Sequence, residues 1–150
     1  MSIEKDIKSS KKMPLSRKSI VNVLYTSNWF KEGLQQVLKN FDLTLEQYNV
    51  LRILRGQNGN PANLSTIQER MLNKMSNTTR LVDKLNKKGF VTREICKKNR
   101  RKIEMYITAK GLEFIAQIDP IINKKDLDMT NKLSNNELQE LNYLLEKLRT

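Results

Sequence analysis

The chain has 150 residues, 38% of them hydrophobic, and its 28 Lys and Arg against 16 Asp and Glu give a net charge of +12. This length and apolar content fit one ordinary domain, which we expect to span residues 1–150. One cysteine excludes an internal disulfide, and the absence of histidine excludes His-ligated zinc and Ser-His or Cys-His dyads. We therefore expect no metal, no cofactor and no enzyme activity.

The positive charge is concentrated in the middle of the chain. Residues 61–110 contain 13 Lys and Arg against four Asp and Glu, so this third of the chain carries +9 of the net charge. A surplus of this kind favours a polyanionic partner, nucleic acid first and an anionic membrane surface second.

The opening segment MSIEKDIKSSKKMPLSRK has no apolar run after its charges, and no later stretch approaches the length of a membrane span. We therefore expect no secretory signal, no membrane partner and a cytoplasmic location. The first dozen residues, rich in Lys and Ser, are expected to fray.

Residues 16–41 place apolar side chains at steps of three and four, which predicts one long helix. A helix of this length is too long for one small domain to cover, so part of its apolar stripe is expected to face a second subunit or a ligand. Core packing is the alternative for any single residue.

A second helix is predicted from near Leu45, because Thr44 and Gln47 form a capping box and Leu43 and Tyr48 a hydrophobic staple.

A helix-turn-helix pattern follows the loop GQNGNPAN. The first short helix is expected from near Ser65, with Ile67 and either Met71 or Leu72 toward the core. The second is expected in SNTTRLVDKLNKKG, with Ser76 as N-cap and Gly89 after its C-terminus. Its buried stripe is formed by Leu81, Val82 and Leu85.

The periodicity then changes from helical to alternating. VTREIC and IEMYIT predict two strands of a hairpin, joined by a loop of about five residues that is formed by the basic run KKNRRK itself. Thr108 is expected to cap a further helix with Leu112, Ile115 and Ile118 on one face, and Pro120 threatens to kink or break it.

A last helix is predicted in SNNELQELNYLLEKL, where Ser134 and Glu137 form a capping box. Its leucines have the spacing of a packing seam that needs another long helix, from the same or a second subunit: Leu138, Leu141, Leu145 and Leu148.

This order of elements resembles the MarR family of winged helix-turn-helix transcription regulators. LTLEQYNVLRIL, TRLVDKLNKKGFVTR and NRRKIEMYITAKG look like its second helix, its recognition helix with the first wing strand, and its wing tip with the following T-x-x-G turn. The resemblance implies a mainly α fold with a small β-hairpin wing. The winged helix-turn-helix would span about residues 43–111, and dimerisation helices about 16–41 and 112–148.

The resemblance further implies a homodimer that binds a pseudo-palindromic double-stranded DNA operator and regulates transcription as a ligand-responsive repressor. The assignment as a repressor rests only on what is common among members of this family. A winged-helix module that binds RNA or an acidic protein is the alternative.

The N-terminal turn of a recognition helix supplies most base contacts. Here that turn offers hydroxyl, amide and guanidinium groups, which read base edges or hold phosphates. The alternative to a DNA contact is helix capping for Ser76, and for Lys84 it is a position on a merely solvated helix face. The candidate DNA-binding residues of this helix are Ser76, Asn77, Thr78, Thr79, Arg80 and Lys84.

The wing tip can enter a minor groove, where narrow A·T-rich segments attract an inserted Arg, here Arg100 or Arg101. Asn99 stands where the family usually has the acid of Asp-Arg-Arg, which anchors the wing through an ion pair, so we expect a looser and more positive wing. The candidate wing residues are Lys97, Lys98, Asn99, Arg100, Arg101 and Lys102.

Family members commonly bind small, often aromatic, effectors between the dimerisation helices and the winged domain. The side chains proposed for such a pocket are aromatic, with core packing as the alternative: Tyr25, Trp29, Phe41 and Tyr48. The family's thiol sensors carry a cysteine near the first helix. Cys96 lies beside the wing instead, so peroxide sensing of that type is not expected.

Overall fold

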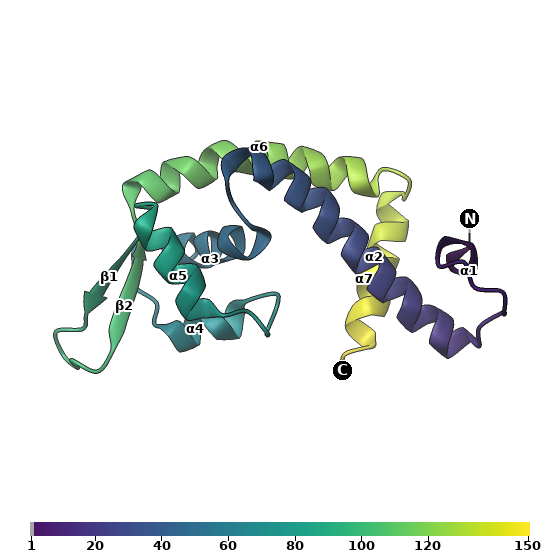
Figure 1. The fold of residues 1–150 in the computed structure, drawn as a ribbon, viewed down its shortest axis with the longest axis horizontal. Helices are drawn as coiled ribbons and strands as arrows, with labels where there is room; N and C mark the ends of the chain where they lie inside the picture. The colour runs from purple at the N-terminus through teal and green to yellow at the C-terminus, as the bar shows by residue number, and fades with distance from the viewer. Residues whose placement is uncertain (1) are drawn as a thin grey trace.

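A computed structural model describes residues 2–150. Its elements, shown in Figure 1, are α1 (Ile3–Asp6), α2 (Leu15–Leu38), the 3-10 turn η1 (Lys39–Phe41), α3 (Leu45–Arg55), α4 (Leu64–Arg70), α5 (Thr78–Lys87), β1 (Val91–Ile95), β2 (Ile103–Ile107), α6 (Ala109–Thr130) and α7 (Asn135–Lys147). The mainly α fold with one β-hairpin is thus confirmed.

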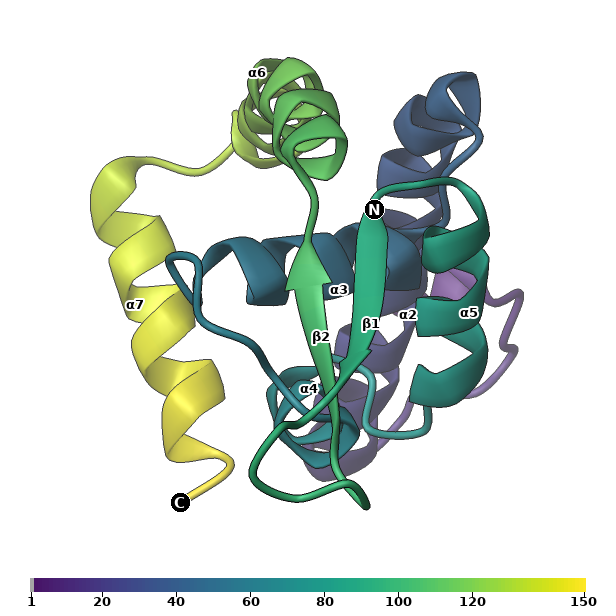
Figure 2. The ribbon, with the colours of Figure 1, turned by 90° about the vertical axis from the view of Figure 1, so that its left-hand side faces the viewer.

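The molecule has two ends. We call α3, α4, α5, β1 and β2 the winged part, and α2, α6 and α7 the arm. In Figure 1 the winged part lies on the left, and α2 and α6 run away from it toward the side where both chain termini lie. Viewed from the winged end, the hairpin faces the viewer, with α5 and α7 on opposite sides of it (Figure 2).

The core of the winged part forms around α3. The predicted capping box is present, because the Thr44 side chain accepts from the Gln47 backbone while the Gln47 side chain accepts from Thr44. From this fixed start, α3 turns an apolar face inward against α5, α6, α4 and β2. The side chains that fill this core are at most 1% exposed: Val50, Leu51, Leu54, Ile67, Met71, Val82, Leu85, Val91, Met105, Ile115 and Ile118.

The hairpin is antiparallel, with Val91 opposite Ile107 and Ile95 opposite Ile103. Ala62, in the loop before α4, pairs with Met105 through two backbone hydrogen bonds and so extends the sheet by one short bridge. The segment that joins the two strands is residues 96–102, two residues longer than expected.

Pro120 does not break α6, which runs unbroken to Thr130. A proline leaves the carbonyl four residues earlier without its helical partner, here that of Ala116. Both residues lie on the exposed face of α6, where water can satisfy that carbonyl. Leu112, predicted to share one face with Ile115 and Ile118, is 42% exposed, whereas both isoleucines are fully buried.

The prediction that the first dozen residues fray is also wrong for α1. Ile3 is only 4% exposed, and Glu4 pairs with Lys18 of α2 over 3.2 Å. A single apolar anchor and one ion pair therefore hold this short helix against the N-terminal half of α2.

The terminal helix α7 has the predicted capping box of Ser134 and Glu137. Its leucine seam is not covered by the chain itself, since Leu141 remains 40% and Leu148 73% exposed. The N-terminal half of α2 is also exposed, since Ile20 is 53% and Leu24 59% exposed. The arm therefore leaves two apolar helix faces without a partner inside the described residues.

Candidate nucleic-acid interface

The helix-turn-helix is formed by α4, residues 71–77 and α5. The turn is fixed at its start by Met71, which is 1% exposed, and by the Leu72 backbone N–H, which donates to the Asn49 side chain over 2.9 Å. Of the two alternatives, Met71 and not Leu72 enters the core, because Leu72 is 88% exposed. The first helix begins at Leu64, with Asn63 as its cap.

Asn77, not Ser76, caps α5. The Asn77 side chain accepts from the Arg80 backbone N–H over 3.2 Å, and the first helical residue is Thr78. Thr78 is 6% exposed and its hydroxyl contacts the Gln68 side chain of α4. This contact fixes the start of the helix, and the predicted N-cap at Ser76 is wrong. The Ser76 hydroxyl is buried without a hydrogen-bond partner among the described residues.

The candidate residues of the recognition helix therefore divide by exposure. Thr78 points into the α4–α5 contact, and Ser76, which is part of the turn, is half-buried. Four remain open to solvent at the N-terminal turns of α5, where they are free to meet a ligand: Asn77, Thr79, Arg80 and Lys84.

The wing tip is a loop of exposed cations. The Arg101 backbone N–H donates to the Asn99 side chain over 3.1 Å, and the Lys102 N–H donates to the Asn99 carbonyl over 2.9 Å. All six candidate wing residues are exposed, and none of the five cations pairs with a carboxylate within residues 2–150. The loop thus presents its full positive charge to solvent.

An ion pair that the sequence reading missed joins the wing to the recognition helix. Arg93 of β1 pairs with Asp83 of α5. The ten-residue separation of these residues crosses a helix, a turn and a strand, so no local pattern signals the contact. It ties the base of the wing to the face of α5 that also carries the exposed Arg80 and Lys84.

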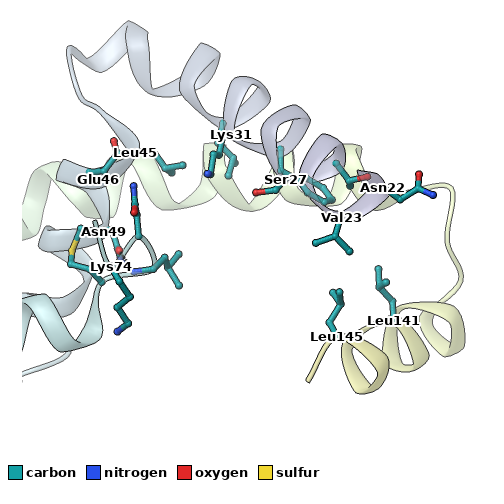
Figure 3. A pocket seen from close by; sticks show the side chains of 16 residues that line it. Asn22, Val23, Ser27, Lys31, Leu45, Glu46, Asn49, Lys74, Leu141 and Leu145 are labelled. Carbon is teal, nitrogen blue, oxygen red and sulfur yellow. Dashed lines mark hydrogen bonds between the residues drawn. The ribbon is translucent and has the colours of Figure 1, made fainter. Parts of the chain in front are cut away.

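A cavity of about 660 Å³ lies between the arm and the winged part. In Figure 3, Val23 of α2 faces Leu141 and Leu145 of α7 across the gap, while Leu45 and Asn49 of α3 line the other end. The remaining lining combines four apolar residues, Phe30, Leu34, Met71 and Leu72, with seven polar or charged ones: Asn22, Thr26, Ser27, Lys31, Glu46, Asn73 and Lys74.

The four aromatic residues proposed for an effector pocket do not line this cavity. Tyr25 and Trp29 are 45% and 48% exposed on α2. Phe41 packs edge-on against Phe114 of α6, with ring centroids 6.2 Å apart. The Tyr48 hydroxyl donates to Asp119 of α6 over 2.7 Å. The structure does not bring these aromatic side chains together, so that pocket composition is wrong.

None of the helices in residues 2–150 is long and apolar enough to cross a membrane.

Comparison with known proteins agrees with this geometry. The family model described as "MarR family" matches residues 43–103. The uncharacterized HTH-type transcriptional regulator YkoM of Bacillus subtilis (strain 168) is 34% identical over 87 residues. That match covers 58% of this chain and 56% of YkoM, so the chain spans little more than half the length of this relative.

Two solved structures share the fold over most of the chain. The organohalide-sensing regulator RdhR-CbdbA1625, in its 2,4-dichlorophenol-bound form, is 20% identical with a TM-score of 0.84, covering 92% of this chain and 81% of that one. BpsR of Bordetella bronchiseptica, whose DNA binding is regulated by 6-hydroxynicotinic acid, is 18% identical with a TM-score of 0.81, covering 93% and 98%. The MarR family model thus matches the helix-turn-helix and most of the wing, and the two solved structures show that the chain shares their fold.

Proposed function

We propose that the protein is a cytoplasmic, homodimeric repressor that binds a pseudo-palindromic DNA operator and releases it when a small molecule binds. The observation that carries this proposal is the joint exposure of the N-terminal turns of α5 and the unpaired cations of the wing tip. One surface can enter a major groove and the other can lie in the adjacent minor groove.

The recognition helix would read bases through Asn77, Thr79 and Arg80. An Arg forks onto guanine and an Asn onto adenine, so these side chains can distinguish sequences. Because the Asn77 oxygen already caps the helix, its amide group is the part left free for a base. Lys84, one turn beyond Arg80, is suited to a phosphate. Thr78 would act indirectly, by fixing where α5 begins.

The wing would supply affinity more than sequence choice. Arg100 or Arg101 is the inserted residue, with Lys97, Lys98 and Lys102 near the phosphates and Asn99 holding the turn. A wing of five unpaired cations has no carboxylate to displace before it meets DNA. The proposal therefore assigns to it a large part of the salt-dependent binding energy.

The dimer would be formed by the arm. The bare apolar faces of α2 and α7 are the surfaces that a second copy would cover. Two winged parts related by a two-fold axis then meet two half-sites about one helical turn apart, which is why a pseudo-palindrome is expected.

The cavity between α2, α3 and α7 would hold the effector. Most of its lining surface is apolar and Lys31 and Lys74 are among the lining residues, so a small apolar molecule with an anionic or phenolic group suits it. RdhR-CbdbA1625 binds 2,4-dichlorophenol and BpsR responds to 6-hydroxynicotinic acid, and both molecules are of this kind. Because the cavity touches both the arm and α3, a ligand there would alter the angle between the two.

Selection from a random duplex library tests this function. The expected result is a pseudo-palindrome bound by a dimer. If each dimer neutralises about eight phosphates, log K should fall with log salt at a slope of roughly −7. Recovery of no consensus, or preferential binding of structured RNA in a parallel gel shift, would reject the proposal and favour the RNA-binding or protein-binding alternative.

A further inference from the structure

Helix α3 joins the winged part to the arm, and it is held at its N-terminal end by α2. The Leu45 backbone N–H donates to the Gln35 side-chain oxygen over 3.0 Å, and the Gln35 amide group donates to the Leu43 carbonyl over 3.1 Å. One side chain of the arm thus fixes the position where α3 begins.

The rest of α3 packs on the buried face of α6, and one carboxylate of α6 adds polar contacts to this packing. One oxygen of Asp119, Oδ1, accepts from the Tyr48 hydroxyl over 2.7 Å, and the other, Oδ2, pairs with Arg55. Tyr48 is 5% exposed, and the Asp119 side chain is 26% exposed. The two partners lie seven residues apart, about two helical turns. Since each Asp119 oxygen is used by a different turn of α3, α6 cannot slide along or turn about α3 without breaking a contact.

The same helix forms the centre of the winged part. It packs against α4, α5 and β2, and Val50, Leu51 and Leu54 are buried there. Close packing of this kind transmits a displacement instead of absorbing it. Any rotation of α3 on α6 would therefore carry the recognition helix and the wing with it.

We propose that Asp119 is a positioning residue that fixes the angle between the winged part and the arm, and thereby selects the spacing between operator half-sites. This inference rests on the proposed function, since it requires a dimer on two half-sites. With 10 to 10.5 base pairs per turn, each added base pair moves a half-site by about 3.4 Å and rotates it by roughly 35°. Only a stiff connection between arm and winged part can reject such a change.

The test compares Asp119→Asn with wild type, using Glu113→Gln as control, because Glu113 is an exposed carboxylate on the same helix. Dissociation constants are measured for the selected operator and for versions with one or two base pairs added or removed between the half-sites. A duplex with a single half-site reports base reading alone.

Asp119→Asn is expected to lower the discrimination between correct and incorrect spacings about fivefold, the factor of one ordinary hydrogen bond. Affinity for the single half-site should be unchanged, and Glu113→Gln should behave as wild type. Tyr48→Phe removes only the hydroxyl and should give a smaller loss in the same direction. Because both act through one contact, the double variant should lose less than the sum of the two.

Unchanged spacing discrimination in both Asp119→Asn and Tyr48→Phe would overturn the positioning role. An equal loss of affinity for every spacing and for the single half-site would also overturn it, since that is the result of a merely structural contact. If the wild-type protein selects no operator, the proposed function itself fails. If wild type selects an operator with a spacing preference that both variants keep, only this inference fails.

Discussion

The backbone N–H of Arg101 donates to the side-chain oxygen of Asn99, so the one uncharged residue of the basic run also sets its turn. The Asn99 carbonyl accepts from Lys102, whose own carbonyl accepts from the Cys96 N–H over 2.9 Å. These bonds close the tip of the hairpin without an ion pair. Asn99 thus supplies the turn but not the charge that the family's acid would give, and the looser wing expected from its presence stays a prediction.

Replacing Asn99 with Ala should loosen the wing tip and weaken DNA binding. The loss of one exposed hydrogen bond corresponds to roughly 0.5–1 kcal/mol, or about two- to fivefold in affinity. Thermal stability should hardly change, because Asn99 is exposed. Hydrogen exchange at the Arg101 amide measures the loosening directly, and Asn99→Asp, which keeps the acceptor, should retain the protection of that amide. Equal exchange in the Ala variant and wild type would contradict this role for the side chain.

Arg80→Ala should relax sequence choice more than it lowers overall affinity. A lost bidentate base contact costs about 1–3 kcal/mol of discrimination at one operator position. Binding to the selected operator and to single-base variants measures this. If every base at every position is still discriminated as in wild type, Arg80 does not read a base.

Removing both Arg100 and Arg101 should weaken all duplexes alike. Each lost phosphate or groove cation lowers the salt slope by about one, so the slope per protomer should become shallower by roughly two. Lys124→Ala with Lys132→Ala removes the same charge from two exposed positions, one in α6 and one in the turn before α7, and serves as control. An equal change in the control would mean that net charge, and not the wing, determines binding.

The parts of the fold that were predictable are those determined within a few residues. The capping boxes of Thr44 with Gln47 and Ser134 with Glu137 are local contacts, and the structure contains both. The alternation that predicted the hairpin is likewise a property of each strand alone. Local patterns of this kind carry their own physical cause, so they survive in the folded chain.

The predictions were wrong where contacts between segments far apart in the sequence determine the structure. Ser76 and Asn77 are both good N-caps, and the choice between them depends on the contact of Thr78 with Gln68 in the preceding helix. The aromatic pocket failed for the same reason, because α6 takes Phe41 and Tyr48 for its own contacts. The cavity that did form is lined from α2, α3, the α4–α5 turn and α7, a combination that no single stretch of sequence indicates.

The contribution of Asp119 to stability should depend on pH. Burial disfavours its charged form, but the hydrogen bonds from Arg55 and Tyr48 outweigh burial, and the pKa of the carboxyl lies below its ordinary value of 3.8. A lowered pKa means that the stabilisation is present above the unfolded value and is lost as pH falls through the folded one. Asp119→Asn should therefore cost about 1 kcal/mol at pH 7, an amount reduced by partial solvation, and the difference from wild type should shrink below pH 3.8.

Urea unfolding of wild type and Asp119→Asn at several pH values measures this difference. Asp126, whose pKa burial raises, acts in the opposite direction but is present in both proteins, so it cancels from the comparison. A difference that stays constant down to acid pH would show that the charge of Asp119 is not what stabilises α3 on α6.

Two glycines should respond differently to Ala. A Cβ at Gly111 would lie 2.4 Å from the carbonyl oxygen of Phe90, which is fixed because it accepts from the Thr108 N–H. Gly111→Ala should therefore cost about 1–3 kcal/mol. A Cβ at Gly33 would meet the flexible end of Met129 at 2.5 Å, which can rotate away, and Ala gains helix propensity of about 1 kcal/mol. In thermal unfolding, the melting temperature of Gly33→Ala should lie near that of wild type, and that of Gly111→Ala well below it. The reverse order would contradict the packing described for these two glycines.

The leucine seam of α7 gives the sharpest test of the proposed dimer. Leu141 is 40% and Leu148 73% exposed in the single chain, so replacing both with Glu leaves the protomer's buried core untouched. In a dimer the same change places charges in an apolar contact, where they are strongly unfavourable. Sedimentation should then report a monomer that binds a single half-site weakly, while Asn142→Glu, an exposed polar position on α7, should leave the dimer intact. A double variant that remains dimeric would place the subunit contact elsewhere, and the bare face of α2, with Ile20 and Leu24, would have to form it alone.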